Sequence, residues 1–324
     1  MPTVYFHPGA PKTGTSYLQV LFARHINEMA QHELVYPEND FVTGAREGQI
    51  TSGNGVELAN FIRPELPHKI DNKSAFLGNL DHLLKNGDGK NFLFSSEFMV
   101  FQSNERTDAL IDCLQKNKYD AKVIYLVRDF SKAARSAYSQ QVKRAGEGRT
   151  FEEFLKKWDP YYLHHINLMN SAFGRENVNI FNYEEHKSRL ASLFFKDFIG
   201  IDINVENTDQ TEIINRSLDN KELELLRIFN EFSGGGNAFS STLISDALMK
   251  IPSTSNEKFV ATPEEFEILS SRFGGDVDKI NSQLRGRNIS LADDVKPADR
   301  QVHLSEFERF TVAALAQITK SIRR

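Results

Sequence analysis

The sequence predicts an α/β protein: a central, mostly parallel sheet flanked by helices, with a helical C-terminal extension. In the first part of the chain, short runs of β-branched and aromatic residues alternate with stretches of helical periodicity. That order is typical of a parallel sheet covered on both faces. Beyond Asp202 the helical patterns continue without strand-like runs. We therefore expect an α/β core over residues 1–202, and a helical part over residues 203–324 that packs on the same domain.

The strands and helices of the core follow one another in order. The first strand, Thr3–Phe6, is stopped by Pro8-Gly9, and a helical spacing of apolar residues starts at Gly14. Three more strands are predicted over Asn91–Ser95, Lys122–Val127 and Val178–Phe181. Helices are predicted over Ala109–Leu114, Ser131–Ala145 and Glu185–Ile199, the last two ended by Gly146 and Gly200. The polar, glycine-rich segment Phe41–Gly55 is predicted to be a mobile loop near the first strand and helix.

The extension has its own helix signals. Asn220–Phe232 carries apolar residues on one face and is followed by three consecutive glycines. Thr262 with Glu265, and Ser305 with Glu308, have the spacing of capping boxes that open helices.

Charge and composition exclude several classes of protein. The 324 residues carry a formal net charge of −5, which argues against a general nucleic-acid or anionic-membrane binder. Cys113 is the single cysteine, so an intrachain disulfide framework and a multi-cysteine metal site are excluded. No run approaches the ~18 apolar residues of a membrane span, and the N-terminal residues lack the basic and apolar regions of a secretory signal. We expect a cytoplasmic protein without a membrane span; its oligomeric state is left open.

The loop after the first strand is the most informative segment. It reads Gly9-Ala10-Pro11-Lys12-Thr13-Gly14-Thr15-Ser16 and joins the carboxyl end of a strand to the first turn of a helix. Such a junction exposes unpaired backbone N–H groups at the positive end of the helix dipole, and therefore binds anions. Lys12 adds a full positive charge, and Thr13, Thr15 and Ser16 add hydroxyl donors.

The loop is P-loop-like but departs from a Walker A sequence at one position. A Walker A loop has lysine directly after its second glycine, where it reaches the β- and γ-phosphates. Here Thr15 follows Gly14, and Lys12 precedes that glycine by two residues. This departure disfavours ATP hydrolysis.

A second anion site is predicted in the middle of the chain. Arg128 ends the strand Lys122–Val127, and Ser136 lies eight residues further on, in the following helix. Ligands of open α/β sheets bind beyond the carboxyl ends of the strands, and the planar fork of arginine suits a phosphate. For Arg128 alone, a salt bridge with Asp129 or another neighbour is an alternative, and for Ser136 alone a solvated serine is the simpler interpretation.

Together the two motifs resemble those of sulfotransferases that use 3′-phosphoadenosine 5′-phosphosulfate (PAPS). Pro11-Lys12-Thr13-Gly14-Thr15-Ser16 looks like the phosphosulfate-binding loop, and Arg128 with Ser136-Ala137-Tyr138 looks like the 3′-phosphate motif. The resemblance implies that Lys12 contacts the phosphosulfate and stabilises the departing oxygen, and that Thr13, Gly14, Thr15 and Ser16 hold the 5′-phosphate. It implies 3′-phosphoadenosine 5′-phosphate (PAP) as the product. Phe130 stands where the family commonly has proline. The resemblance covers roughly residues 3–202.

Glu97 is the predicted general base. It follows the strand Asn91–Ser95 as part of Ser95-Ser96-Glu97, and it resembles the glutamate base of several carbohydrate sulfotransferases. A structural role for Glu97, capping a helix or pairing with a cation, stays open. His7 is the alternative base, because an unperturbed imidazole titrates near neutral pH; it could instead orient the loop. His164 and His165 lack a convergent third ligand, so no metal site is predicted.

The sequence therefore predicts a sulfotransferase that moves the sulfuryl group from PAPS to a hydroxyl or amine by in-line transfer. The expected partner is a small-molecule or glycan acceptor, with a carbohydrate or glycolipid preferred because the glutamate base resembles that branch. A P-loop small-molecule kinase and a non-catalytic nucleotide-binding protein are the alternatives.

Overall fold

The computed structural model describes residues 1–63, 73–102, 104–205, 218–236, 238–250, 261–292, 295, 305, 308 and 311–316. Their contacts divide the chain into two units. The first unit comprises Met1–Arg128, Tyr161–Asp209 and Asp278–Ile289. The second comprises Asp129–Pro160, Gln210–Val277 and Ser290–Arg324. The predicted division into residues 1–202 and 203–324 stays a prediction.

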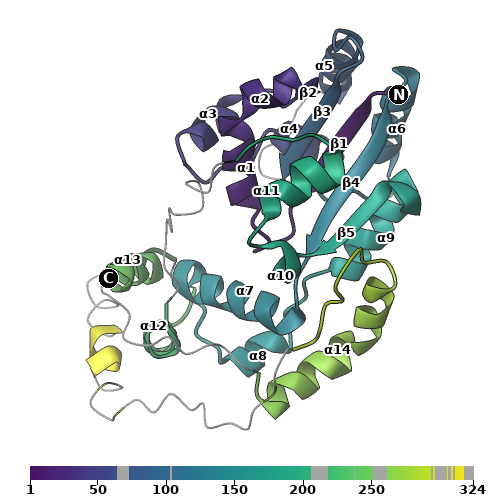
Figure 1. Ribbon diagram of the computed structural model, residues 1–324. Coiled ribbons are helices and arrows are strands. Elements are labelled where there is room, and N and C mark those ends of the chain that lie inside the picture. The colour runs from purple at the N-terminus through teal and green to yellow at the C-terminus, as the bar shows by residue number, and fades with distance from the viewer. Residues whose placement is uncertain are drawn as a thin grey trace. The chain divides into compact units, whose positions relative to one another are not determined.

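The first unit contains a five-stranded parallel sheet in the order β2-β3-β1-β4-β5 (Figure 1). Its strands are β1 (Thr3–Pro8), β2 (Leu34–Val35), β3 (Asn91–Ser96), β4 (Asp120–Val127) and β5 (Val178–Asn182). All strands are parallel, so their carboxyl ends lie along one edge of the sheet. The predicted fold class, a P-loop-like parallel sheet flanked by helices, is confirmed.

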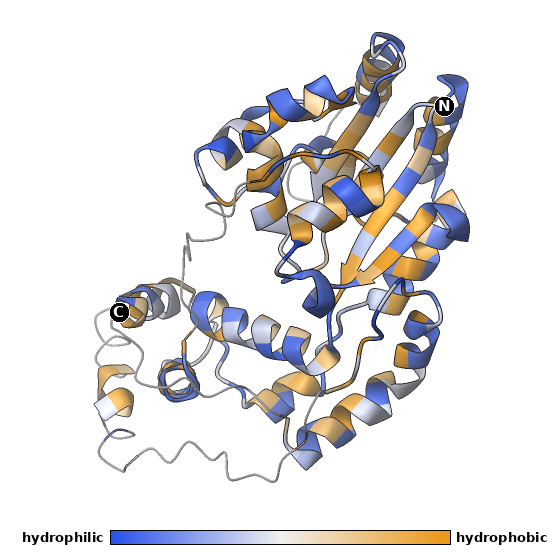
Figure 2. Ribbon diagram, in the orientation of Figure 1, coloured by the Kyte–Doolittle hydropathy of each residue, from blue (hydrophilic) through white to orange (hydrophobic). Residues whose placement is uncertain are grey.

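Helices cover both faces of this sheet. They are α1 (Thr15–Arg24), α2 (Ile26–Gln31), α3 (Asp40–Arg46), α4 (Val56–Ile62), α5 (Lys73–Lys85), α6 (Glu105–Lys116), α9 (Tyr162–Phe173), α10 (Tyr183–His186) and α11 (Leu190–Ser192), with the short η1 (Arg175–Asn177) and the π-helix η2 (Leu193–Ile199). Figure 2 shows hydrophobic residues along the strands, as expected for a sheet that is buried on both sides.

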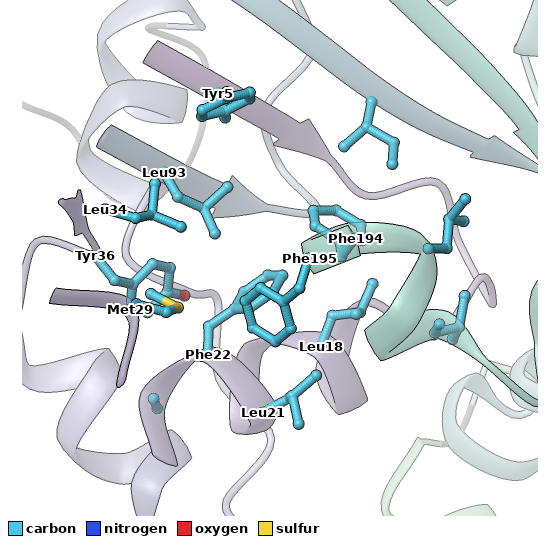
Figure 3. Packing of buried hydrophobic residues seen from close by; sticks show 14 of the residues in the cluster. Tyr5, Leu18, Leu21, Phe22, Met29, Leu34, Tyr36, Leu93, Phe194 and Phe195 are labelled. Carbon is cyan, nitrogen blue, oxygen red and sulfur yellow. The ribbon is translucent and has the colours of Figure 1, made fainter. Parts of the chain in front are cut away.

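Alternate residues of a strand face opposite layers, and β1 illustrates this. Tyr5 belongs to a buried cluster on one face, with Phe22 of α1 and Phe194 of η2 (Figure 3). Its neighbour Phe6 packs on the other face, with ring centroids 5.4 Å from Phe173 of α9. The strand that precedes the glycine-rich loop is therefore fixed from both sides.

The second unit is helical in its described residues. It contains α7 (Phe130–Ala145), α8 (Phe151–Leu155), α12 (Asn220–Phe232), α13 (Ala238–Met249) and α14 (Pro263–Asn281), whose last residues belong to the first unit. Both α12 and α13 pack against α7. The predicted capping box at Thr262 is present: Glu265 N lies 3.2 Å from Thr262 Oγ1, and Thr262 N lies 2.9 Å from Glu265 Oε2. Ser305 and Glu308 exchange the same pair of bonds.

Two sequence-based expectations differ from the structure over part of their range. The segment predicted as a loop over Phe41–Gly55 contains most of α3, because the Asn39 side chain caps this helix by accepting a bond from Val42 N at 3.1 Å. The helix predicted over Glu185–Ile199 is instead α10, α11 and η2. Arg189 takes φ −141° and ψ 33°, outside the helical region, and interrupts it.

No helix among the described residues is long and apolar enough to cross a membrane.

Candidate active site

The loop between β1 and α1 is held by its own hydrogen bonds. Gly9 N donates to Ser96 O of β3 at 3.1 Å, and Thr13 Oγ1 donates to Ala10 O at 2.7 Å. Lys12 has φ 65° and Gly14 has φ 80°. A left-handed backbone is unfavourable for lysine, and such strain is typical of functional sites. The loop therefore has a fixed shape, with Lys12 exposed at its tip.

The hydroxyl of Thr15 is buried beside Gly9, at the start of the loop. Thr15 is the first residue of α1, and its Oγ1 is buried without a hydrogen-bond partner in the protein. A Cβ on Gly9 would lie 2.3 Å from that oxygen, so only glycine leaves room for it. Because a buried hydroxyl without a partner is destabilising, a ligand or water at this helix N-terminus is expected to satisfy it. The loop thus has the shape and the donors of an anion site.

The hydroxyl of Thr13 acts inside the loop. Its proton is donated to Ala10 O, and Thr13 is buried, whereas Ser16 is half-buried on the first turn of α1. Thr13 therefore stabilises the loop. The first intrahelical bond of α1 runs from Leu18 N to Gly14 O, so the backbone N–H groups of Gly14, Thr15 and Ser16 are the ones that the helix leaves for an anion.

Arg128 lies beside the same loop. Its Nη1 lies 3.4 Å from Lys12 O. Its Nε donates to Glu184 Oε1 at 2.5 Å, and its guanidinium carbon lies 5.3 Å from the ring centroid of Tyr183. Arg128 thus forms a salt bridge, the alternative that the sequence left open, and its partner is Glu184. Asp129, the partner considered there, instead accepts a bond from Ser290 N in the second unit.

Ser136 lies on α7 of the second unit, where its side chain is half-buried. Its pairing with Arg128 around one phosphate stays a prediction.

His7 joins the ends of β1 and β3. Its Nδ1 lies 2.9 Å from Ser95 Oγ, and these two residues are also partners in the strand register. Its ring meets that of Phe194 edge-on, with centroids 4.9 Å apart. Complete burial lowers the pKa of His7 to about 3, because an apolar environment disfavours the charged imidazolium. His7 is therefore neutral near neutral pH.

Glu97 follows β3 directly and lies next to the loop. Burial of its carboxyl raises the pKa of Glu97, while the positive charge of Lys12 acts in the opposite direction. The two charged groups are thus close enough to interact, although Glu97 as a whole is exposed to solvent.

Glu97 and the loop also line one pocket. The pocket has a volume of about 430 Å³, and Gly9 and Pro11 contribute to its wall. His164 and His165 of α9 also line this pocket. From the sequence, they were considered only as metal ligands, and no metal site was predicted. The pair of adjacent histidines was the available signal, but only the fold shows that α9 borders this pocket. The described residues contain no group of three metal-ligating side chains.

Comparisons with known proteins identify the family of the chain. The model of the sulfotransferase domain matches residues 6–223. The chain belongs to the sulfotransferase family. The predicted PAPS-dependent sulfotransferase is thereby confirmed at the level of the family.

Solved structures of sulfotransferases resemble the chain at low identity. A sulfotransferase from Alicyclobacillus acidocaldarius is 18% identical, with 78% of this chain and 98% of that chain covered and a TM-score of 0.41. The sulfotransferase domain from the curacin biosynthetic pathway is 16% identical, with coverages of 85% and 98% and a TM-score of 0.35. Mouse sulfotransferase SULT7A1, crystallised with PAP, is 16% identical, with coverages of 70% and 66% and a TM-score of 0.32. No curated protein matches the chain.

Proposed function

We propose that this sulfotransferase binds PAPS at the loop of Lys12 and transfers its sulfuryl group to an acceptor hydroxyl or amine in the pocket that Glu97 lines. The observation that carries the proposal is that one pocket is bordered both by the loop and by Glu97. An anion site and a carboxylate base are the two components that transfer to an oxygen or nitrogen acceptor requires.

The residues of the loop and Arg128 fit the two anionic ends of one nucleotide. PAPS supplies the activated sulfuryl group when it is bound. The unpartnered hydroxyl of Thr15 and the backbone N–H groups of Gly14, Thr15 and Ser16 fit the 5′-phosphate. Arg128 is close to Lys12 O and still has N–H donors beyond the Nε that Glu184 engages. We assign it to the 3′-phosphate.

Lys12 and Glu97 have opposite roles in the transfer. Lys12, exposed at the loop tip, stabilises the negative charge on the oxygen that leaves with the nucleotide. Glu97 takes the proton that the acceptor loses as its oxygen bonds to sulfur. A carboxyl whose pKa is raised by burial is a stronger base than an ordinary one. His7 is the weaker candidate, because its pKa of about 3 makes it a poor base and its Nδ1 is engaged with Ser95.

The acceptor and the cellular location complete the proposal. A carbohydrate or glycolipid acceptor follows from the resemblance of Glu97 to the base of carbohydrate sulfotransferases. Cytoplasmic location and the form of the acceptor, small molecule or glycan, likewise stay predictions.

Nucleotide binding provides the first test. Isothermal titration calorimetry of the full chain should show tighter binding of PAP than of ATP, and the Thr15→Ala variant should bind PAP less tightly. Incubation with ³⁵S-labelled PAPS and a panel of alcohols, amines and sugars should then label an acceptor. Tighter binding of ATP than of PAP would rule out the proposed function.

A further inference from the structure

Arg128 leaves the sheet beside the residues that begin α10. In the parallel register of β4 and β5, Val127 lies opposite Asn182, so Arg128 and Tyr183 come next at the carboxyl ends of two neighbouring strands. The guanidinium carbon of Arg128 lies over the Tyr183 ring, 5.3 Å from its centroid. The Nε of Arg128 donates to Glu184 Oε1 at 2.5 Å. Both contacts come from α10, so this short helix holds the guanidinium on two sides.

Glu184 is itself held in place. Its backbone N–H donates to the side chain of Asn182 at 2.9 Å, and Asn182 is completely buried at the end of β5. The side chain of Glu184 is only 5% exposed, and a buried carboxylate is unfavourable unless cations compensate its charge. Arg128 pairs with its Oε1, and Lys187 Nζ lies 3.0 Å from its Oε2. The carboxylate is therefore a fixed support with a cation on each oxygen.

Glu184 engages only one edge of the Arg128 guanidinium. Nε donates to Glu184, and Nη1 lies 3.4 Å from Lys12 O. Within the described part of the chain, no hydrogen bond engages Nη2. The guanidinium is planar and its N–H donors have fixed directions, so an anchored Nε also fixes the direction of Nη2. A donor that is already oriented binds an anion with a smaller loss of rotamer freedom.

The charge of Glu184 acts against anion binding, whereas its position favours it. A carboxylate next to Arg128 repels a phosphate, although Lys187 offsets part of this repulsion. Removal of the charge alone should therefore strengthen phosphate binding, and removal of the support should weaken it. Because the two effects have opposite signs, an experiment can separate them.

We propose that Glu184 is a positioning residue for the nucleotide: it holds Arg128 in the orientation that binds the 3′-phosphate, and it thereby contributes to the selection of 3′-phosphorylated nucleotides. This inference rests on the proposed function, which assigns Arg128 to the 3′-phosphate. Adenosine 5′-monophosphate (AMP) has the 5′-phosphate of PAP and lacks the 3′-phosphate. The ratio of the Kd for AMP to the Kd for PAP therefore measures this selection.

Isothermal titration calorimetry of the full chain gives both dissociation constants for each variant. Arg128→Ala removes the assigned donor. Glu184→Ala removes the support, Glu184→Asp keeps the charge on a shorter side chain, and Glu184→Gln keeps an acceptor oxygen without the charge. Glu38→Gln is the matched control, because Glu38 forms a 2.6 Å ion pair with Arg46 shortly after β2, and β3 and β1 lie between β2 and β4 in the sheet.

We expect Arg128→Ala to lower the ratio by about 10- to 100-fold, the effect of losing charged hydrogen bonds to the phosphate. Glu184→Ala and Glu184→Asp should lower it by about three- to tenfold, because the arginine then loses its rotamer freedom on binding. Glu184→Gln should stay close to the wild-type ratio, since its oxygen still accepts from Nε, and Glu38→Gln should equal wild type. In the Arg128→Ala background, Glu184→Ala should cause no further change. In transfer assays, Glu184→Ala should raise the KM for PAPS more than it lowers kcat.

Three results overturn the inference: an unchanged or higher ratio in Glu184→Ala, equal losses in Glu184→Ala and Glu184→Gln, or a further loss in the double variant. A merely structural role of Glu184 would raise both dissociation constants and leave the ratio unchanged. Failure of the proposed function gives a different pattern: wild type binds AMP as tightly as PAP, or Arg128→Ala keeps the wild-type ratio, and the inference then falls with the assignment of Arg128. Thermal melts identify variants that do not fold, and if Glu184→Ala is one of them, Glu184→Asp decides.

Discussion

Gly9→Ala tests the anion cradle with the addition of one methyl group. An added Cβ would lie 2.3 Å from Thr15 Oγ1, 2.5 Å from Thr15 Cγ2 and 2.9 Å from Thr15 Cβ. All of these distances are shorter than side-chain carbons tolerate. The backbone of Gly9 is not left-handed, so alanine is acceptable there apart from this one contact. The methyl group therefore has to move Thr15, the residue whose hydroxyl we assign to the 5′-phosphate.

The expected magnitude has two parts. Overpacking of a buried site costs about 1–3 kcal/mol of folding free energy, which thermal or urea unfolding will show. Displacing a hydroxyl that donates to a charged phosphate costs about 1.5–3 kcal/mol of binding energy. By the conversion of 1.4 kcal/mol to a factor of ten, the Kd for PAP should rise by roughly 10- to 100-fold.

A double-mutant comparison shows whether the loss acts through Thr15. The Kd for PAP is measured for Gly9→Ala, Thr15→Ala and the double variant. If alanine at position 9 acts mainly by displacing the Thr15 hydroxyl, the double variant binds PAP only slightly worse than Thr15→Ala alone, because the contact with the Cβ of residue 15 at 2.9 Å is the one of the three that remains. Gly78→Ala is the control, because Gly78 lies in α5 with no atom within 4 Å of an added Cβ. Wild-type affinity in Gly9→Ala, or additive losses in the double variant, would refute the reasoning.

The remaining predictions concern the three charged residues. Lys12→Ala should lower turnover by about 10²–10³, the effect of removing one transition-state donor; near-normal kcat would contradict its role. Because Lys12 lowers the pKa of Glu97, the residual activity of that variant should fall off at a higher pH than in wild type as the pH is lowered. Glu97→Gln should lower turnover by about 10²–10⁴ while calorimetry shows unchanged PAP binding; retained activity would make His7 the base to test next. Arg128→Ala should mainly raise the KM for PAPS, and an unchanged KM would place the 3′-phosphate elsewhere.

The strands and the loop were predictable because their signals are local. A short run of β-branched and aromatic residues before Pro8-Gly9 identifies β1, and Gly14 and Thr15 mark the start of α1 without reference to the rest of the chain. The strand β2 was missed because its two residues, Leu34–Val35, show no periodicity. The break at Arg189 was missed because the apolar spacing continues through it.

The contribution of α9 to the pocket was missed for a different reason. Tyr125 and His165 are separated by 40 residues and lie on a strand and a helix, respectively. Nothing in the local sequence of His164-His165 indicates which strand the helix covers. Their shared pocket is a property of the packing of α9 on β4, and only the fold brings these groups together.

The pairing of β1 with β3 explains how the anion site and the base are held together. In this parallel register His7 lies opposite Ser95 and Pro8 opposite Ser96, and Gly9 N continues the ladder to Ser96 O. The residues that follow these strands are the loop and Glu97, so the register itself determines that they leave the sheet side by side. The side chain of His7 adds a hydrogen bond with Ser95 near the carboxyl ends of the two strands, just before the chains separate. Because its pKa of about 3 keeps it neutral, that bond does not change between pH 5 and 8, and we assign the loss of activity that is expected at low pH to Glu97.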